Sequence, residues 1–196
     1  MSVTRDSGTR KGQAVNSLGM AHGIDVTYSI AEYYASKGHA YNFNTGNITL
    51  TSGSESSVAY IENSEDEDLI VTLLVYLLGG STGGAAGEEH LVQIMRNPTA
   101  VSYSTAQAPV NRNCKSFNTL NGNFYKGAEA ATSTAGTVMI ESVFSSEGRQ
   151  TVNVGAVVVG KGNSIAIDIT PKASNTSMVI QAAVGMYLDK DNLLGA

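Results

Sequence analysis

Short runs of apolar and β-branched residues, separated by turn residues, make up most of the chain from Ala40 onward. In several of these runs apolar residues recur at every second position, which is the period of a β-strand. No long helical pattern interrupts them. The expected strands are 41–43, 48–50, 58–62, 70–78, 90–96, 101–104, 138–144, 152–159, 164–169 and 178–187.

The turn residues between these runs predict how the strands are connected. Residues 44–47, Asn-Thr-Gly-Asn, predict a hairpin between the first two strands. The run 70–78 is almost continuously apolar, so we expect this strand to be covered on both faces. Asn97 and Pro98 should end the strand before them, because proline cannot donate a hydrogen bond to a ladder.

Residues 105–135 form a long polar excursion that is rich in asparagine. Loops of this length in compact domains are usually functional or make a contact. The expected total of roughly eight to ten strands suits two packed sheets. The predicted fold class is therefore all-β, an antiparallel β-sandwich of jelly-roll-like form with an extended N-terminal arm.

The arm is predicted at residues 1–38, which are polar and show no sustained hydrophobic period, and the sandwich domain at residues 39–196. Within the arm two local structures fit the residues. Ser29 can cap a short helix that Gly38 ends, and residues 26–30 can equally form a strand.

Composition excludes several classes of partner. The formal net charge of −5 argues against nucleic acid, whose binding depends on clustered Lys and Arg. Cys114 is the only cysteine, so an intrachain disulfide is impossible. The N-terminus has no apolar signal region, and the longest apolar run, 69–78, is too short to span a bilayer as a helix. We expect a protein that is made in the cytoplasm and binds no membrane.

Residues for catalysis or metal binding are sparse. The only candidates for a catalytic base are His22, His39 and His90, and no Gly-x-Ser-x-Gly motif accompanies them. No short His or Cys spacing suits a transition metal, and the glycine-rich residues 79–87 lack the Lys of a phosphate loop. We therefore expect no catalytic residue, no metal and no cofactor. An enzyme that uses two carboxylates from distant strands remains a third hypothesis.

Carbohydrate or receptor binding is the main alternative function. The chain has nine tyrosines, and exposed aromatic rings and amide side chains are common sugar-binding groups. However, it has no tryptophan, and Tyr60, Tyr76 and Tyr187 lie within apolar strands where core packing explains them. Tyr103 and Tyr125 are the candidates that remain.

Four segments carry a resemblance to a known family: residues 59–63 (AYIEN), 95–99 (MRNPT), 125–129 (YKGAE) and 160–167 (GKGNSIAI). In these segments and in its low-charge, Gly/Ser/Thr/Ala-rich character, the chain resembles the decoration or cement proteins of tailed-bacteriophage heads. The resemblance covers the sandwich and not the arm.

The resemblance implies a structural virion protein on the capsid exterior that forms a homo-oligomer, a dimer or a trimer. Its partner would be the major capsid protein, and its role would be to tie neighbouring capsomers together. An arm that cannot fold alone can become ordered on such a shell, and many copies turn modest contacts into high avidity. We expect residues 1–38 and 105–135 to make these contacts.

Overall fold

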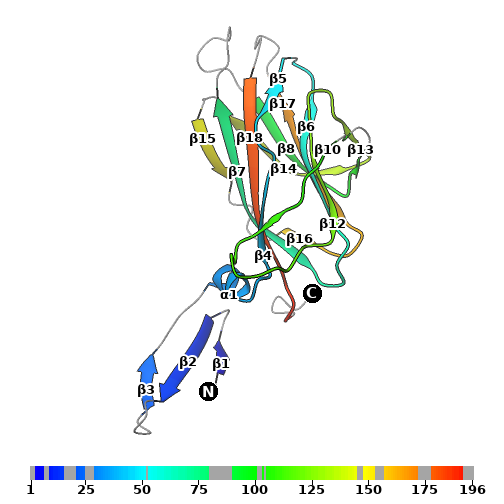
Figure 1. Ribbon diagram of the computed structural model, residues 1–196. Helices are drawn as coiled ribbons and strands as arrows, with labels where there is room; N and C mark the ends of the chain where they lie inside the picture. The colour runs from blue at the N-terminus through cyan, green and yellow to red at the C-terminus, as the bar shows by residue number, and fades with distance from the viewer. Residues whose placement is uncertain are drawn as a thin grey trace.

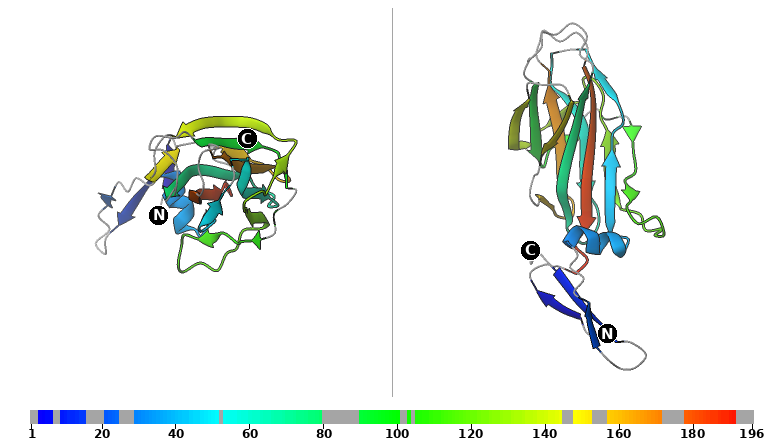
Figure 2. Two further views of the ribbon diagram at one scale, coloured as in Figure 1. Left: turned by 90° about the horizontal axis from the view of Figure 1, so that it is seen from above. Right: turned by 90° about the vertical axis from the view of Figure 1, so that its left-hand side faces the viewer.

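The computed structural model describes residues 3–6, 9–15, 21–24, 29–51, 53–79, 90–100, 103, 105–144, 148–152, 157–171 and 178–191. Almost all of their regular structure is strand, and Figure 1 and Figure 2 show two layers of strands packed face to face. The prediction of an all-β antiparallel sandwich is confirmed. No helix in the described ranges has the length and hydropathy to cross a membrane.

The first sheet has the order β11-β4-β18-β7-β15, with β5 paired to β18 and β16 paired to β7. All of its pairings are antiparallel. Its strands are β4 (Ala40–Asn44), β5 (Ile48–Leu50), β7 (Leu69–Gly79), β11 (Val110–Asn111), β15 (Gly148–Val152), β16 (Val157–Val159) and β18 (Met178–Leu188).

The second sheet has the order β10-β12-β6-β17-β8-β14 and is also antiparallel throughout. A separate two-stranded pair, β9 (Thr99–Ala100) with β13 (Ser133–Thr134), lies outside both sheets. The strands of the second sheet are β6 (Ser56–Asn63), β8 (His90–Arg96), β10 (Thr105–Ala106), β12 (Gly122–Lys126), β14 (Thr137–Phe144) and β17 (Ser164–Thr170).

The order of the long strands is that of a jelly roll. Strands β4 and β5 lie in line along β18, and β15 and β16 lie in line along β7, so each pair acts as one interrupted strand. With β6, β7, β8, β14, β17 and β18 they make eight strand positions. Numbered along the chain, these positions run 1-8-3-6 in one sheet and 2-7-4-5 in the other, which are two interleaved Greek keys.

The predicted hairpin at residues 44–47 is wrong. β4 and β5 do not pair with each other, because Thr45 continues the ladder to β18 through its side chain. The Thr45 N–H donates to the carbonyl of Ala182 at 2.9 Å, and its Oγ1 accepts from the Ala182 N–H at 3.0 Å. The hydroxyl thus replaces a backbone carbonyl, and the chain passes through a local kink without reversing direction.

Several other strand predictions agree with the structure, whereas the expected strand 152–159 is found only as the end of β15 and as β16, with residues 153–156 outside the described residues. The strand that begins at His90 ends at Arg96, and Asn97 and Pro98 follow it as expected. In the polar excursion, however, the five-residue β12 forms an inner part of the second sheet, with the buried Phe124 on its inward face. Most of the expected strand 101–104 and of the glycine-rich loop 79–87 lies outside the described residues.

Helix α1 (Ile30–Ser36) decides between the two local structures that the sequence allowed near Ser29. Ser29 caps it, with the Glu32 N–H donating to Ser29 Oγ at 3.2 Å and the Ser29 N–H donating to the Glu32 carboxylate at 2.8 Å. Gly38, at φ +76°, follows the end of the helix. This reciprocal arrangement is a capping box, so the helical alternative is the correct one.

Two apolar clusters stabilise the fold. The larger one fills the space between the sheets, and it includes alternate residues of β17, Ile165, Ile167 and Ile169. The smaller one lies under α1, where the ring of Tyr34 stacks on Tyr187 of β18 with centroids 4.9 Å apart. Helix α1 therefore packs onto the sandwich, and burial on this scale contributes roughly 1.5–3 kcal/mol for each large side chain.

Three further strands precede α1, in a segment for which the sequence pattern predicted no regular element. They are β1 (Val3–Asp6), β2 (Thr9–Val15) and β3 (Ala21–Ile24). They form their own antiparallel sheet in the order β1-β2-β3, with no strand pairing to the sandwich among the described residues.

Candidate functional site

The loop between β11 and β12 is fastened to the end of α1 by asparagine side chains. The Asn111 Nδ2 donates to the carbonyl of Gly38 at 2.9 Å and to that of Asn118 at 3.0 Å. Asn118 Nδ2 donates to the same Gly38 carbonyl at 3.2 Å, and Asn113 Nδ2 donates to the Ser36 carbonyl at 3.1 Å. We call residues 111–118 the braced loop.

The braced loop also holds its own shape. The N–H of Asn113 donates to Asn111 Oδ1 at 2.9 Å, and the N–H of Lys115 donates to Asn113 Oδ1 at 3.0 Å. These are Asx turns, in which a side chain replaces a backbone acceptor. At Gly38 a Cβ atom would lie 2.3 Å from Ser116 Oγ, so loop and helix end approach each other more closely than any other residue type allows.

This rigid loop presents an apolar side chain to solvent. Phe117 is 99% exposed, and Val110, in the adjoining edge strand β11, is 70% exposed. An aromatic ring held in water by an ordered loop gains nothing for the fold of its own chain. Aromatic residues, phenylalanine among them, are enriched in the buried centres of protein interfaces.

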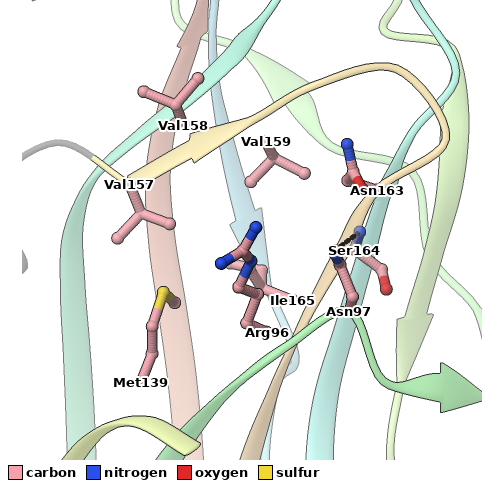
Figure 3. Close-up of a pocket in the computed structure, with 9 residues that line it drawn as sticks. All are labelled: Arg96, Asn97, Met139, Val157, Val158, Val159, Asn163, Ser164 and Ile165. Atoms are coloured by element: carbon pink, nitrogen blue, oxygen red, sulfur yellow. Dashed lines mark hydrogen bonds between the residues drawn. The ribbon is translucent and has the colours of Figure 1, made fainter. Parts of the chain in front are cut away.

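A second candidate lies between the edges of the two sheets, where Figure 3 shows a pocket at β14 and β16. Its volume is about 310 Å³. We call it the Arg96 pocket because the guanidinium of Arg96 lies among its other lining side chains. The lining residues are Arg96, Asn97, Met139, Val157, Val158, Val159, Asn163, Ser164 and Ile165.

The Arg96 pocket has an apolar side and a polar side. Among the described residues no carboxylate lies within 4.0 Å of Arg96, so its charge has no ion-pair partner there. On the polar side the Ser164 N–H donates to Asn97 Oδ1 at 3.2 Å. On the apolar side Met139 and Val158 are exposed at 38% and 47%. The pocket is open to a ligand that is mainly apolar.

Strand β14 is an edge strand with apolar side chains on its surface. Val138 and Val143 are 43% and 55% exposed, and β14 pairs with β8 on one side only. Its register shifts between Val138 and Ile140, which marks a bulge beside Met139. Exposed edges with apolar residues are sites where another chain can add.

The structure brings the two sequence-derived candidates for sugar binding together. Tyr103 and Tyr125 have ring centroids 5.9 Å apart, and each also contacts Tyr60. Glu62 Oε2 accepts from Tyr60 and from Asn123 Nδ2, each at 3.1 Å. The result is an aromatic cluster with a carboxylate and an amide beside it, on the outer face of the second sheet.

Tyr103 is less available than the sequence suggested. It is half-buried and its hydroxyl is hydrogen-bonded to Ser57, which in turn donates to the buried Asp168. Burial raises the pKa of Tyr103 well above its ordinary value. Tyr125 is thus the better placed of the two rings.

Asp168 is a buried carboxyl that the sequence analysis did not single out. It is 1% exposed, and Ser133 in β13 donates to its Oδ2 at 2.8 Å. Burial raises the pKa of Asp168, although the hydrogen bonds from Ser57 and Ser133 act in the opposite direction. Because its partners Ser57 and Ser133 come from β6 and β13, Asp168 ties the pair β9–β13 to the second sheet.

The three histidines lie on different parts of the fold, with His22 in β3. His90 is buried at the start of β8, whereas His39 lies between α1 and β4. Burial lowers the pKa of His39, and the charge of Lys190 acts in the same direction. Within the described ranges no three His, Cys, Asp or Glu residues cluster as a metal site would require, and Cys114 is exposed.

No family model matches the chain, and no curated protein matches it. The VP2 subviral particle of infectious bursal disease virus is 9% identical with a TM-score of 0.21, covering 96% of this chain and 50% of that one. T=1 particles derived from infectious bursal virus give 8% identity and a TM-score of 0.19, over 96% and 48%.

The chain thus spans about half the length of each of these solved structures. The jelly-roll assignment comes from the observed strand order.

Proposed function

We propose that the chain is a structural virion protein that binds the outside of a bacteriophage capsid and stabilises contacts between capsomers, without catalysing a reaction. The observation that carries the proposal is the braced loop, which presents the 99% exposed Phe117 to a partner. The jelly-roll strand order supports it, since this fold recurs in viral capsid domains, although it also occurs in lectins and cupins.

The proposed mechanism is added binding energy. Residues 1–38 and the excursion 105–135 contact the major capsid protein or neighbouring copies. Repetition of a modest contact over many copies raises the overall avidity by orders of magnitude. The chain acts as a homo-oligomer on the capsid exterior, and no cofactor takes part.

Cosedimentation with empty phage shells tests this proposal. We expect the full chain to bind in a saturable ratio to the capsid protein and to raise the temperature at which the shell breaks open. A variant without residues 1–28 keeps α1 on the sandwich and should bind more weakly. A full chain that neither sediments with shells nor changes their melting contradicts the proposal.

A carbohydrate-binding module is the second candidate, because the cluster of Tyr60, Tyr103 and Tyr125 carries Glu62 and Asn123 at its side. If this cluster binds sugar, glycan binding should be saturable. Tyr125→Ala should lose this binding, and Phe117→Ala should keep it. A glycan array followed by calorimetry measures this. Binding that both variants lose equally would argue against the cluster as the site.

A further inference from the structure

We propose that Phe117 of one copy binds in the Arg96 pocket of a second copy of this chain. This inference rests on the proposed function, in which the protein acts as an oligomer. It identifies a second copy of the chain as the partner of the braced loop. The loop and the pocket lie on different elements, and Phe117 is 99% exposed, so it does not fill the pocket of its own copy.

The loop meets the requirements of an interface anchor. Interfaces are dominated by a few well-packed side chains, among which aromatic residues are frequent. Ordering a flexible loop on binding reduces affinity, and the hydrogen bonds of Asn111, Asn113 and Asn118 remove much of that cost beforehand. Of the large apolar side chains that the structure describes as exposed, Phe117 is the only aromatic one.

The size and walls of the Arg96 pocket suit a phenyl ring. Its volume is about 310 Å³, whereas an apolar cavity of about 150 Å³ is enough to bind benzene. Five of its lining side chains are apolar, and they come from three different strands or their ends. These are Met139, Val157, Val158, Val159 and Ile165.

The polar groups of the pocket also favour a neutral aromatic ligand. The Arg96 guanidinium has no carboxylate partner among the described residues, and an arginine over a ring face gains a cation–π interaction. The thioether of Met139 can contact a ring edge favourably. A carboxylate ligand could form an ion pair with Arg96. However, it would lose its hydration beside the valines of β16, and desolvation of a charge is costly. A ring satisfies both sides of the pocket.

A contact between two different surfaces of one chain has two possible geometries. Two copies can exchange it reciprocally and close a dimer, or each copy can bind the next, which closes a cyclic oligomer or extends into an open filament. Both geometries contain the same local contact, so the same substitutions test it.

Sedimentation velocity on the full chain over a range of concentrations is the first measurement. We expect Phe117→Ala and Val158→Asp each to weaken self-association at least ~30-fold, the size typical of an interface anchor. Thr49→Asp is the matched control, because Thr49 is also an exposed β-branched residue of a strand but does not line the pocket. It should associate as the unmodified chain does. Circular dichroism checks that each variant is folded.

Mixing gives the sharper test. The Phe117→Ala variant keeps an intact Arg96 pocket, and the Val158→Asp variant keeps the side chain of Phe117. The two variants together can therefore form one contact that neither forms alone. We expect the equimolar mixture to yield a complex of one copy of each variant. A mixture that stays monomeric, or a Phe117→Ala variant that associates normally, overturns the inference.

Cross-linking locates the contact directly. Cys114 is the only cysteine and lies three residues before Phe117 in the exposed part of the braced loop. In the variant Val158→Cys, a bismaleimide reagent should join position 114 of one copy to position 158 of another. Phe117→Ala in the same background should abolish the link, and a link that persists would count against the contact.

Failure of this inference is distinguishable from failure of the proposed function. If the chain is monomeric at every concentration yet still binds shells, the inference is wrong and the capsid role stands. If Phe117 substitution removes shell binding but leaves the oligomer intact, the braced loop contacts the shell instead. Self-association through Phe117 without any shell binding would support the inference and contradict the capsid role.

Discussion

The side-chain amide of Asn111 donates a 2.9 Å hydrogen bond to the backbone carbonyl of Gly38, and this joins the braced loop to the end of α1. Asn111→Ala removes that bond and the one to the Asn118 carbonyl. We expect a loss of about 1–3 kcal/mol in the free energy of unfolding, measured by urea denaturation. A loss of self-association at unchanged stability would mean that the side chain acts in binding directly.

Gly38 should tolerate no side chain. Gly38→Ala places a Cβ atom 2.3 Å from Ser116 Oγ at a φ of +76°. Gly162→Ala is the matched control, because Gly162 has a φ of +73° but nothing within 4 Å of the new atom. We expect both variants to lose about 1 kcal/mol from backbone strain and Gly38→Ala to lose more. If thermal unfolding shows the same loss of stability for both variants, the braced loop moves away from the new Cβ atom without a cost in free energy.

Thr45→Val should destabilise the first sheet. The substitution keeps the shape of the side chain but removes the Oγ1 that accepts from the Ala182 N–H at 3.0 Å. An unsatisfied buried donor costs roughly 1–3 kcal/mol. Thr49→Val, at an exposed position of β5, is the control and should change stability little. If the two variants unfold at the same denaturant concentration, the hydroxyl does not serve as the ladder acceptor.

Asp168 predicts a pH dependence of stability. Burial raises the pKa of Asp168 in the folded state above its ordinary value of 3.8. The stabilisation from the protonated carboxyl is therefore fully present below pH 3.8, and it is lost as the pH rises through the folded-state pKa. Glu55, whose pKa is raised by burial and by the charge of Asp168, titrates in the same direction.

Asp168→Asn removes this effect. We expect the unfolding free energy of the unmodified chain, relative to the variant, to decrease as the pH rises from below 3.8 through the raised folded-state pKa of Asp168. Chemical denaturation across that range measures it. A raised pKa would be contradicted if the difference in unfolding free energy between the two proteins did not change with pH. It would also be contradicted if the unmodified chain became more stable, relative to the variant, as the pH rises.

Local patterns in the sequence were enough for most strands, and they offered the helix capped by Ser29 as one of two alternatives. Alternation in 164–169 and the stop at Pro98 depend only on neighbouring residues, and so does the capping of α1 by Ser29 and Glu32. The turn residues at 44–47 were misleading, because whether Thr45 reverses the chain or continues a ladder depends on β18, more than 130 positions away. β12 was missed because Phe124 is its only large inward apolar residue.

The sequence by itself determined an all-β sandwich and an asparagine-rich excursion that was expected to make contacts. Only the tertiary structure decided which part of that excursion is rigid, because Asn111 and Asn118 meet Gly38 only after α1 packs on Tyr187. The Arg96 pocket has the same origin. Its walls come from β8, β14, β16 and β17, which are distant along the chain and become neighbours only when two sheets close on one core.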